Sequence, residues 1–540
     1  MQVSKIWQSS IKYAFLKLWD NYLTMIKTVQ ITCLPEQCAN DAAITKFLER
    51  EFGFQASDLS GFKIIKKSID ARRKPIKVNL QIDVFLNEEP EKDTFSLQLK
   101  NVSNAPEVAI IGAGPAGLFA ALRLIELGYK PVIFERGKAV KERRRDLANI
   151  TRHNAVNPDS NYCFGEGGAG TYSDGKLYTR SSKRGDVMRI LKILVAYGAD
   201  PSILFEAHPH IGTNKLPQII TAIREQIIAC GGVVHFDARI TDLNIKDNAI
   251  QGVYVGAAHY SFKQLILATG HSARDIYELL DRKKVLIEAK PFALGVRIEH
   301  PQELIDQIQY KCTGHRGDFL PAASYSLVQQ VADRGVFSFC MCPGGIIAPA
   351  MTAPGEIVVN GWSPSKRNNP YANSGMVVSV RTEDYKKYES AGALAGMYFQ
   401  KQVEQDCFNK GNKSLQAPAQ RMADFVARKT SNTLPKNSYL PGTISRNLHD
   451  ILPAFVATGL QEAFKQFGNK MRGYLTNEAI LLATESRTSS PVRIPRNKEN
   501  FEHPQIKGLY PCAEGAGYAG GIVSAAMDGE NCASAIGNLS

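Results

Sequence analysis

Glycines at three fixed positions form the strongest chemical signal in the chain. Gly112, Gly114 and Gly117 follow a short apolar run and open a helical pattern. The first glycine permits a tight turn, the second lets the backbone approach a diphosphate, and the third lets a helix pack closely on a strand. Free N–H groups at the start of that helix, with Pro115 and Ala116 in its first turn, favour a bound anion. The spacing therefore predicts a dinucleotide-binding turn.

An acidic residue stands where such a turn requires one. Glu135 ends the next apolar run, eighteen residues after Gly117, and Arg136 follows it. A carboxylate at this position is spaced to accept hydrogen bonds from the ribose hydroxyls of adenosine. We therefore expect Glu135 and Arg136 to contact the adenosine half of the ligand.

The same glycine spacing occurs twice more, beginning at Gly165 and at Gly515. The first copy follows no clear strand, and the second has too few residues after it for another βαβ unit, so we predict no separate nicotinamide domain. The insertion around the first copy suits backbone N–H groups near a phosphate or a flat ring, with a surface loop as the alternative. Its predicted contacts are Gly167, Gly168, Ala169, Gly170 and Thr171.

Two residues are predicted to transfer protons, His271 and Glu166. His271 follows Ala268-Thr269-Gly270 at the end of a predicted strand, where ligands of parallel sheets bind. A structural hydrogen bond is the alternative for His271. Other proton carriers that the sequence leaves open are His208, His210 and Tyr172.

Cys340 and Cys342 invite a redox interpretation, in which a dithiol exchanges electrons with a bound ring. A bridge between cysteines two apart would close a small, strained ring, and free cysteine is often a buried apolar residue. No zinc or other metal site is predicted, because no second cysteine or histidine pair has the usual spacing. Four cations of this region are candidates for binding an anionic group, with surface solubility as the alternative: Arg297, Lys366, Arg367 and Arg487.

The motifs require a parallel sheet with helices to position them. Val108 to Ile111, Pro131 to Phe134 and Val233 to Phe236 predict strands, while Pro115 to Leu127 and Pro217 to Ala229 predict helices. The expected fold class is α/β. It combines a Rossmann-like three-layer fold with an inserted mixed domain and a small N-terminal α/β domain.

At 540 residues the chain is too long for one core, and we predict three domains. Residues 25–103 would form a small α/β, ferredoxin-like domain. Residues 104–287 and 500–540 would bind the nucleotide, and residues 288–499 would form a substrate or cap domain with one helical stretch, Tyr385 to Phe408. Residues 1–24 are interpreted as an extension that need not be native, or alternatively as an amphipathic surface helix.

Composition places the chain among ordinary folded proteins, with 44% apolar and 22% charged residues. The net charge of +13 favours anionic partners, although solvated basic faces explain stretches such as Lys138 to Arg145. Ten cysteines without a recognisable secretory signal indicate a reducing compartment, so we expect a cytoplasmic protein. The longest apolar stretch is interrupted by glycines and charges, and no membrane span is predicted.

Three signals in a fixed order resemble the glutathione-reductase-type FAD folds. In that class a late strand ends in an acidic residue and glycines, which contact the ribityl and pyrophosphate part of FAD. The positions here that match this motif and a third FAD-side motif are Glu514, Gly515, Gly521, Ile522, Thr269 and Gly270. The resemblance implies that FAD, rather than NAD, is the resident cofactor.

At closer range the chain is similar to a poorly characterised bacterial family of FAD-dependent dehydrogenases. Matching stretches include KKSIDARRK (66–74), FGEGGAGTYSDGKLYTR (164–180), KPFALGVRIEHP (290–301) and FSFCMCPGG (337–345). The resemblance runs from Met25 to the end of the chain. It implies an FAD-dependent oxidoreductase but no settled substrate.

The predicted function is hydride transfer through FAD, to or from a small anionic or aromatic substrate, with NAD(P)H as a transient donor. One alternative is an FAD-dependent RNA-modifying enzyme that uses the positive charge, and another is a protein with structural FAD. The basic hairpin from Lys63 to Lys77 lacks the interleaved aromatic residues that stack on bases, so a nucleic acid partner is not expected. The sequence leaves the oligomeric state open.

Overall fold

The computed structural model describes residues 25–55, 57–90, 95–179 and 182–538. These residues form two compact units. One unit holds the described residues up to Phe95 together with Leu204–Ala207, and the other holds Ser96–Ile203 and the chain from His208 onward. The prediction for residues 1–24 lies outside the described residues. Across the described ranges, no helix is long and apolar enough to cross a membrane.

The smaller unit is a three-stranded antiparallel sheet that carries one α-helix. Strands β1 (Met25–Cys33) and β2 (Leu59–Asp70) both pair with β3 (Lys77–Leu86). Helix α2 (Asp41–Phe52) packs Ile44 and Leu48 into a core with alternate residues of these strands, as a half-buried sheet requires.

A five-stranded parallel sheet forms the base of the larger unit, with the order β22-β10-β4-β5-β6. Strand β4 lies at its centre, and this position accounts for its apolar, buried sequence. Strand β22 completes the sheet beside β10, although all of the seven-stranded sheet described below lies between them in the chain. The bounds are β4 (Glu107–Ile111), β5 (Lys130–Phe134), β6 (Val233–His235), β10 (Leu265–Leu267) and β22 (Leu509–Pro511).

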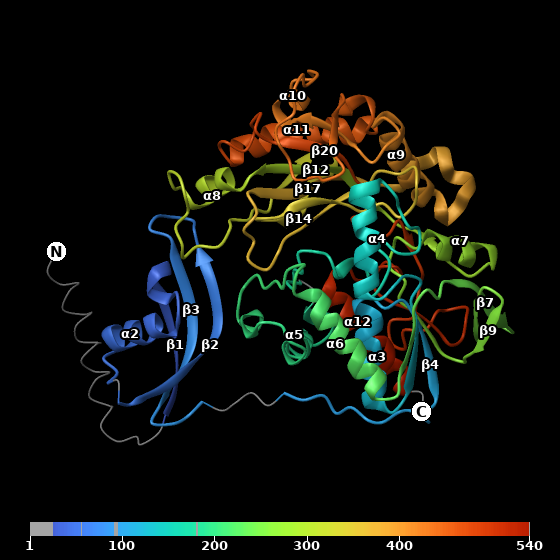
Figure 1. Cartoon of the computed structure of the whole chain (residues 1–540), viewed down its shortest axis with the longest axis horizontal. Helices are drawn as coiled ribbons and strands as arrows, with labels where there is room; N and C mark the ends of the chain where they lie inside the picture. Colours follow the sequence, from blue (N-terminus) through green and yellow to red (C-terminus); the bar gives the residue numbers. More distant parts are fainter. Residues whose placement is uncertain (1–24, 56, 91–94, 180–181, 539–540) are drawn as a thin grey trace. The chain divides into compact units, whose positions relative to one another are not determined.

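Layers on both faces cover this sheet. Helix α3 packs against α6 and α12, and Figure 1 shows the three helices together. Ala109, Ile111 and Phe134 point to the other face, where they share a core with the antiparallel meander β7-β8-β9 and with helix α7. The bounds are α3 (Pro115–Leu127), α4 (Val140–His153), α5 (Val187–Ala196), α6 (Leu216–Ala229), α7 (Arg274–Arg282), α12 (Ile522–Gly537), β7 (Ile240–Lys246), β8 (Ala249–Val255) and β9 (Ala258–Ser261).

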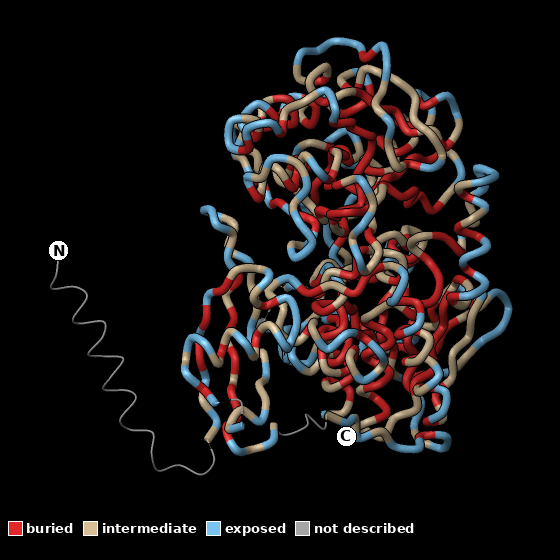
Figure 2. The backbone as a smooth tube through the Cα atoms, turned by 60° about the vertical axis from the view of Figure 1, so that its left-hand side comes forward, coloured by how far each residue is buried: buried red, intermediate tan, exposed pale blue. Residues whose placement is uncertain are grey.

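The larger unit also contains a seven-stranded, mainly antiparallel sheet, with the order β13-β14-β17-β12-β20-β18-β19. Helix α11 packs against strands of this sheet. Figure 2 shows buried residues in the interior of the chain and exposed residues mainly on its outer loops. The strands are β12 (Phe292–Pro301), β13 (Val328–Val331), β14 (Arg334–Cys342), β17 (Tyr371–Val380), β18 (Ala417–Arg421), β19 (Thr443–Ser445) and β20 (Ile480–Glu485). Two short ribbons pair β11 (Glu288–Ala289) with β21 (Val492–Arg493) and β15 (Ile346–Pro349) with β16 (Val359–Trp362).

The prediction of one helical stretch in this region was wrong. Helix α9 covers Ala395–Lys410, but the preceding residues, Thr382–Leu394, form 3₁₀ turns interrupted at Gly392. The region also contains α8 (Gln302–Tyr310), α10 (Met422–Val426) and α11 (Ala454–Lys470). Helix α11 buries both apolar and small residues, and these blur the one-sided pattern that identifies a surface helix. The architecture as a whole confirms the predicted α/β fold class.

Candidate functional site

A cavity opens at the carboxyl ends of β4, β5 and β10. Its wall includes Gly112 after β4, Glu135 after β5, and Thr269 after β10, together with the first residues of α3 and α12. Ligands of open α/β sheets bind outside the carboxyl ends of the strands. Three motifs that lie far apart in the sequence therefore meet at one site.

Two of the glycines after β4 are packed tightly against neighbouring backbone, and the third faces open space. A Cβ on Gly112 would lie 2.5 Å from the Ala268 carbonyl oxygen, and one on Gly117 would lie 2.0 Å from that of Gly112. A Cβ on Gly114 would meet nothing within 4 Å. Gly112 and Gly114 line the cavity, whereas Gly117 lies behind it, where helix α3 packs on the sheet.

Two helices begin at the cavity without a side chain to cap them. Helix α3 begins after Gly114 and α12 begins after Gly521, and neither glycine has a side chain that could accept a hydrogen bond from the N–H groups of the first turn. Pro115, Ala116 and Ile522, at the starts of these helices, all line the cavity. The unpaired N–H groups and the positive ends of two helix dipoles favour an anionic ligand between them.

Glu135 holds the glycine turn and retains hydrogen-bonding capacity. Its Oε2 accepts from the Ala113 N–H at 2.9 Å, and its Oε1 accepts from the N–H groups of Gly137 and Gly165 at 2.9 Å each. A carboxylate offers about four acceptor positions, so one remains on Oε2. The residue is 5% exposed and lines the cavity, which fits a carboxylate that also accepts from a ligand hydroxyl.

Arg136 belongs to a charged cluster at the same end of the cavity. Its guanidinium donates to Asp159 at 2.6 Å and to Asp275 at 2.9 Å, and it lies 4.2 Å from the centre of the Phe164 ring. Arg239 donates to Asp275 at 3.0 Å. Arg136, Arg239 and Asp275 all line the cavity, so a ligand here meets two cations whose charges are partly paired.

Arg143 fixes the glycine-rich insertion from behind. This fully buried guanidinium donates to the carbonyls of Asn161, Tyr162, Glu166 and Gly168 at 2.8 to 3.0 Å. Burial lowers its pKa, since no carboxylate accepts its hydrogen bonds. Sequence reasoning missed this role, because the basic stretch that contains Arg143 was interpreted as a solvated face.

The predicted contacts of the insertion separate into two groups. Gly168, Ala169 and Gly170 line the cavity, and a Cβ on Gly168 would lie 3.3 Å from Gly114 Cα. Gly167 and Thr171 do not line it. Thr171 is buried and donates from Oγ1 to the Glu166 carbonyl at 2.7 Å, so these two residues support the loop.

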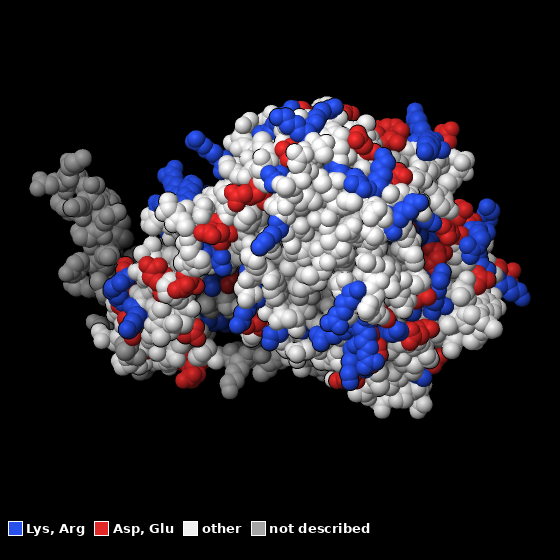
Figure 3. Space-filling model, turned by 45° about the horizontal axis from the view of Figure 1, so that its top comes forward, with Lys and Arg blue, Asp and Glu red and all other residues white. Residues whose placement is uncertain are grey.

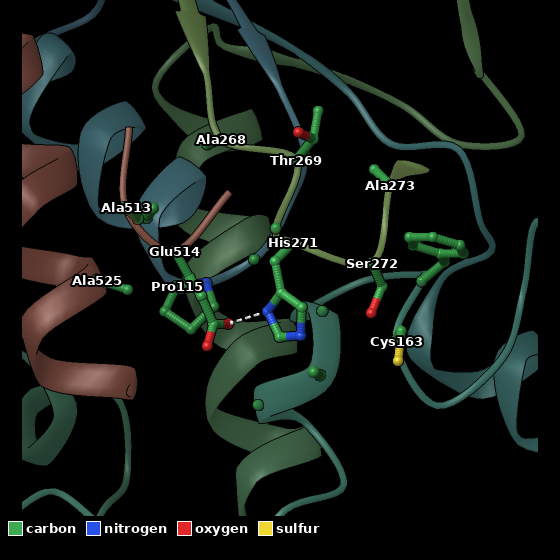
Figure 4. Close-up of a pocket in the computed structure, with 18 of the residues that line it drawn as sticks. Pro115, Cys163, Ala268, Thr269, His271, Ser272, Ala273, Ala513, Glu514 and Ala525 are labelled. Carbon is green, nitrogen blue, oxygen red and sulfur yellow. Dashed lines mark ion pairs between the residues drawn. The ribbon is translucent and has the colours of Figure 1, made fainter. Parts of the chain in front are cut away.

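His271 and Glu514 lie side by side in the cavity wall (Figure 4). Nδ1 of His271 is 3.1 Å from a carboxylate oxygen of Glu514, close enough for an ion pair but without the alignment of a hydrogen bond. Nε2 is buried and has no hydrogen-bond partner within the described part of the chain. A buried ring nitrogen without a partner fits a bound group that supplies one. Gly515 lies behind this pair, since a Cβ there would be 2.8 Å from the Gly270 carbonyl oxygen.

Glu166 does not line the cavity. Its carboxylate accepts from Arg224 at 2.6 Å and from the Val140 N–H at 2.8 Å, and the residue is 1% exposed. These contacts tie the glycine-rich insertion to α4 and α6. Among the alternatives, Tyr172 donates to the Val140 carbonyl and His210 contacts the Ser365 carbonyl.

The four predicted cations lie outside the cavity wall. Arg297 is buried and pairs with Glu485 at 2.9 Å, and Arg487 pairs with Glu404 at 2.9 Å. Arg367 pairs with Asp174 at 2.6 Å. Lys366 is exposed. The polar residues of the wall that sequence reasoning missed include Ser173, Asp174, Lys176, Arg239, Ser272 and Asp275.

A cluster of metal-ligating residue types lies elsewhere, at Cys512, Asp528 and Cys532. Arg496 donates to both oxygens of Asp528, at 2.6 and 2.8 Å, and its Nη1 is 3.7 Å from Cys532 Sγ. The guanidinium thus supplies the positive charge that this carboxylate requires, and the arrangement is that of a buried ion pair.

Comparison with known sequences gives matches over most of the chain. Residues 106–288 match the model of pyridine nucleotide-disulphide oxidoreductases, and residues 291–488 match that of the FAD-dependent protein, C-terminal domain-like family. Residues 25–85 match a domain of unknown function. An uncharacterized protein of Clostridium beijerinckii is 40% identical over 506 residues, which cover 90% of this chain and 94% of the relative.

Solved structures with a similar arrangement include glycine oxidase from Bacillus cereus, at 14% identity and a TM-score of 0.30 over 81% of this chain and 96% of that one. Another is CtdE in complex with FAD, at 10% identity and a TM-score of 0.30, with 80% of this chain and 84% of that chain covered. The fold and the sequence matches define an FAD-dependent oxidoreductase. More narrowly, the chain belongs to the family of FAD-dependent proteins that carry this C-terminal domain and that includes the Clostridium relative.

Proposed function

We propose that the cavity is the FAD site, and that the enzyme passes hydride between FAD and a small anionic or aromatic molecule. Residues 104–287 and 500–540 are proposed as the FAD-binding domain, and residues 288–499 as the substrate domain. The observation that carries the proposal is the meeting of two uncapped helix starts and Glu135 at one cavity. A dinucleotide needs both an anion site and an acceptor for its ribose hydroxyls.

The residues of the wall fit the parts of FAD. The first turn of α3, with Gly114, Pro115 and Ala116, would bind the diphosphate, and Glu135 would bind the adenosine ribose through the free acceptor position of Oε2. Gly521 and Ile522 at the start of α12 would hold the middle of the cofactor. Bound FAD would supply a two-electron acceptor and donor for hydride.

The chain's own residues would position the reacting molecules and move a proton. Glu514 orients His271 through Nδ1, which leaves Nε2 of that ring to hold or deliver a proton inside the cavity. The Lys176 ammonium in the same wall would attract an anionic substrate. Because no separate nicotinamide domain was predicted, NAD(P)H would enter the cavity transiently as electron donor.

The test is the visible absorption spectrum of the purified protein, recorded anaerobically before and after addition of NADH or NADPH. A flavin band that either nicotinamide bleaches supports both the site and the donor. A band that neither bleaches supports FAD but rejects NAD(P)H as donor. Absence of the band after reconstitution with FAD would overturn the proposed site.

The proposed role of His271 has a separate test. The His271→Gln variant keeps a polar side chain of similar reach but cannot exchange a proton near neutral pH. Flavin reduction or turnover should slow by roughly 100-fold, the low end of general acid–base contributions, while FAD stays bound. A normal rate in this variant would leave His271 with a structural role only. His259, an exposed histidine of β9, provides a matched control as His259→Gln.

A further inference from the structure

Two thiols lie beside an ammonium group at the cavity wall, and the proposed hydride transfer gives the thiols no role. Cys340 lines the cavity, and its Sγ lies 4.0 Å from that of Cys342. Nζ of Lys176, another wall residue, is 3.7 Å from the first sulfur and 3.6 Å from the second. The buried Arg297 guanidinium is 3.4 Å from Cys342 Sγ. Both sulfurs therefore share a positive environment.

The backbone is shaped to bring Cys340 to this position. Strand β14 pairs Phe339 with Gly375 of β17 and Cys342 with Asn373, so β14 carries one extra residue between these pairs. Cys340 lies in this bulge with a φ of 45°, which non-glycine residues seldom adopt. Bulges re-aim side chains beside active sites, and such strained conformations persist only where the surroundings hold them. Here Arg297 donates to the Cys340 carbonyl at 2.7 Å.

The two thiols are not equivalent. Cys340 faces the cavity, whereas Cys342 is fully buried behind it. A hydrogen bond from the Cys342 thiol, together with Lys176 and Arg297, lowers the pKa of Cys340 in spite of its burial. Burial and the neighbouring Cys340 sulfur raise the pKa of Cys342. The accessible sulfur therefore has the lowered pKa and the second sulfur lies buried behind it, which is the arrangement that an attacking and a resolving cysteine require.

We propose that Cys340 and Cys342 form a thiol–disulfide exchange pair that reduces a small disulfide entering the cavity. The Cys340 thiolate attacks one sulfur of the disulfide, which releases one thiolate and leaves a mixed disulfide on Cys340. The Cys342 sulfur then attacks the Cys340 sulfur and releases the second half. The products are one protein disulfide, one thiol that carries the Cys342 proton, and one thiolate. The substrate is reduced by two electrons and the dithiol is oxidised by two.

The exchange goes beyond the proposed function and does not depend on it, because no step uses the cofactor. The Cys340–Cys342 disulfide would still need a two-electron donor to restore the dithiol, and an added dithiol serves that purpose in the test. A structural interpretation, in which the cysteines only fill space, does not account for the bulge that brings Cys340 to the cavity wall beside Lys176, which also pairs with Asp174 at 3.6 Å. Cys512 and Cys532 are an internal comparison, since both are buried and neither lines the cavity.

Peptide mapping tests the proposal on the FAD-loaded protein. Cleavage after Arg334 and Lys366 gives a peptide, residues 335–366, with Cys340 and Cys342 as its cysteines. After incubation with glutathione disulfide, this peptide should be lighter by two hydrogen atoms, and dithiothreitol should reverse the change. The Cys342→Ser variant should instead retain glutathione on Cys340, and Cys340→Ser should retain none. Cys512 and Cys532 should stay reduced throughout.

The role of Lys176 is tested by the pH dependence of the rate at which iodoacetamide alkylates Cys340. Lys176→Met should move the pH of half-maximal rate upward by about one unit, because the ammonium no longer stabilises the thiolate. Lys386→Met, at an exposed lysine of the 3₁₀ segment, should leave that pH unchanged.

Two outcomes would overturn the exchange pair. In the first, both thiols of the wild-type peptide stay free after exposure to glutathione disulfide. In the second, the wild-type protein keeps a stable mixed disulfide, which would mean that Cys342 does not resolve it. Both outcomes are read from the wild-type protein, so a variant that fails to fold leaves the test intact. Peptide mapping can also be carried out on protein that shows no flavin band. Failure of the exchange pair can therefore be distinguished from failure of the proposed FAD site.

Discussion

The Glu135 carboxylate accepts a hydrogen bond from the Ala113 N–H at 2.9 Å and so ties the end of β5 to the glycine turn after β4. The same side chain accepts from two further N–H groups, those of Gly137 and Gly165. One carboxylate therefore organises the turn, its own strand end and the start of the glycine-rich insertion.

The Glu135→Gln variant should bind FAD more weakly. A glutamine would point an NH₂ donor at backbone donors, and this costs about 1–3 kcal/mol, or roughly 5-fold to 150-fold in affinity. Titration of the apoprotein with FAD, followed by fluorescence quenching, measures the change. Glu225→Gln, at an exposed position of α6, is the control, and equal affinity in both variants would contradict the role given to Glu135.

Substitution by alanine should have different effects at two glycines of the same turn, lowering FAD affinity at one and stability at the other. Gly114→Ala places a methyl group in open space at the cavity, so FAD affinity should fall by about tenfold or more while thermal stability is kept. Gly117→Ala drives the methyl group into the Gly112 carbonyl and should cost about 1–3 kcal/mol of folding free energy or more. Thermal unfolding of both apoproteins distinguishes the two effects. Loss of stability in the first variant would argue against an open position.

Arg143→Met should destabilise the protein by at least about 3 kcal/mol, because four carbonyls, two of them in buried and two in partly buried hydrogen bonds, lose their donor at once. The glycine-rich insertion should also become accessible to proteases. Denaturant unfolding and limited proteolysis provide the two measurements. Arg145→Met, on the exposed side of α4, should change neither, and similar behaviour of the two variants would show that the buried contacts matter little.

His300 should make stability depend on acid pH. Burial lowers its pKa from 6.5 to about 4, although the Tyr474 carbonyl accepts its hydrogen bond at 2.9 Å and opposes the shift. The unfolded chain therefore binds a proton below pH 6.5 that the folded chain refuses until about pH 4. Stability should fall by roughly 3 kcal/mol as the pH drops through this window.

The measurement for His300 is thermal unfolding across the same pH range in the wild type and in His300→Gln. Glutamine retains an N–H donor for Tyr474 but does not titrate, so the variant should have a flatter profile. Parallel profiles for the two proteins would assign the acid sensitivity to other groups.

Most of the cofactor fold could be predicted from the sequence because its signals are local. Gly112 and Gly117 lie where a Cβ would clash with the backbone, and Gly114 lies at an open position, as the motif predicts. The strands and helices around them begin and end close to the predicted residues. Turn geometry, strand burial and helix starts all depend on short stretches of chain.

The rest of the site depends on contacts between distant segments. Lys176 and Cys340 are 164 residues apart, and neither lies in a pattern that predicts the meeting. Arg143 was missed for a similar reason, since a basic stretch does not reveal which cation turns inward. Glu166 was predicted to move protons from its place in a glycine motif, but its environment depends on Arg224 of α6.

Composition gives the net positive charge but does not predict where the cationic side chains lie on the molecule. On the face shown in Figure 3, Lys and Arg side chains are interspersed with Asp and Glu. The net charge of +13 is therefore a sum over many mixed regions, and the cations that bear on chemistry are few and partly buried.

Strand β22 pairs with β10, and α12 provides the second helix start at the cavity, but both follow the seven-stranded sheet in the chain. During synthesis, the ribosome therefore completes β4, α3 and β10 long before the residues that finish the same sheet emerge. Until then the nascent chain would expose one edge of β10 and half of an anion site, and domains otherwise tend to fold as they appear. With FAD in the proposed site, the cavity would be complete only after translation has passed Gly521, so loading with FAD would belong to the end of biosynthesis.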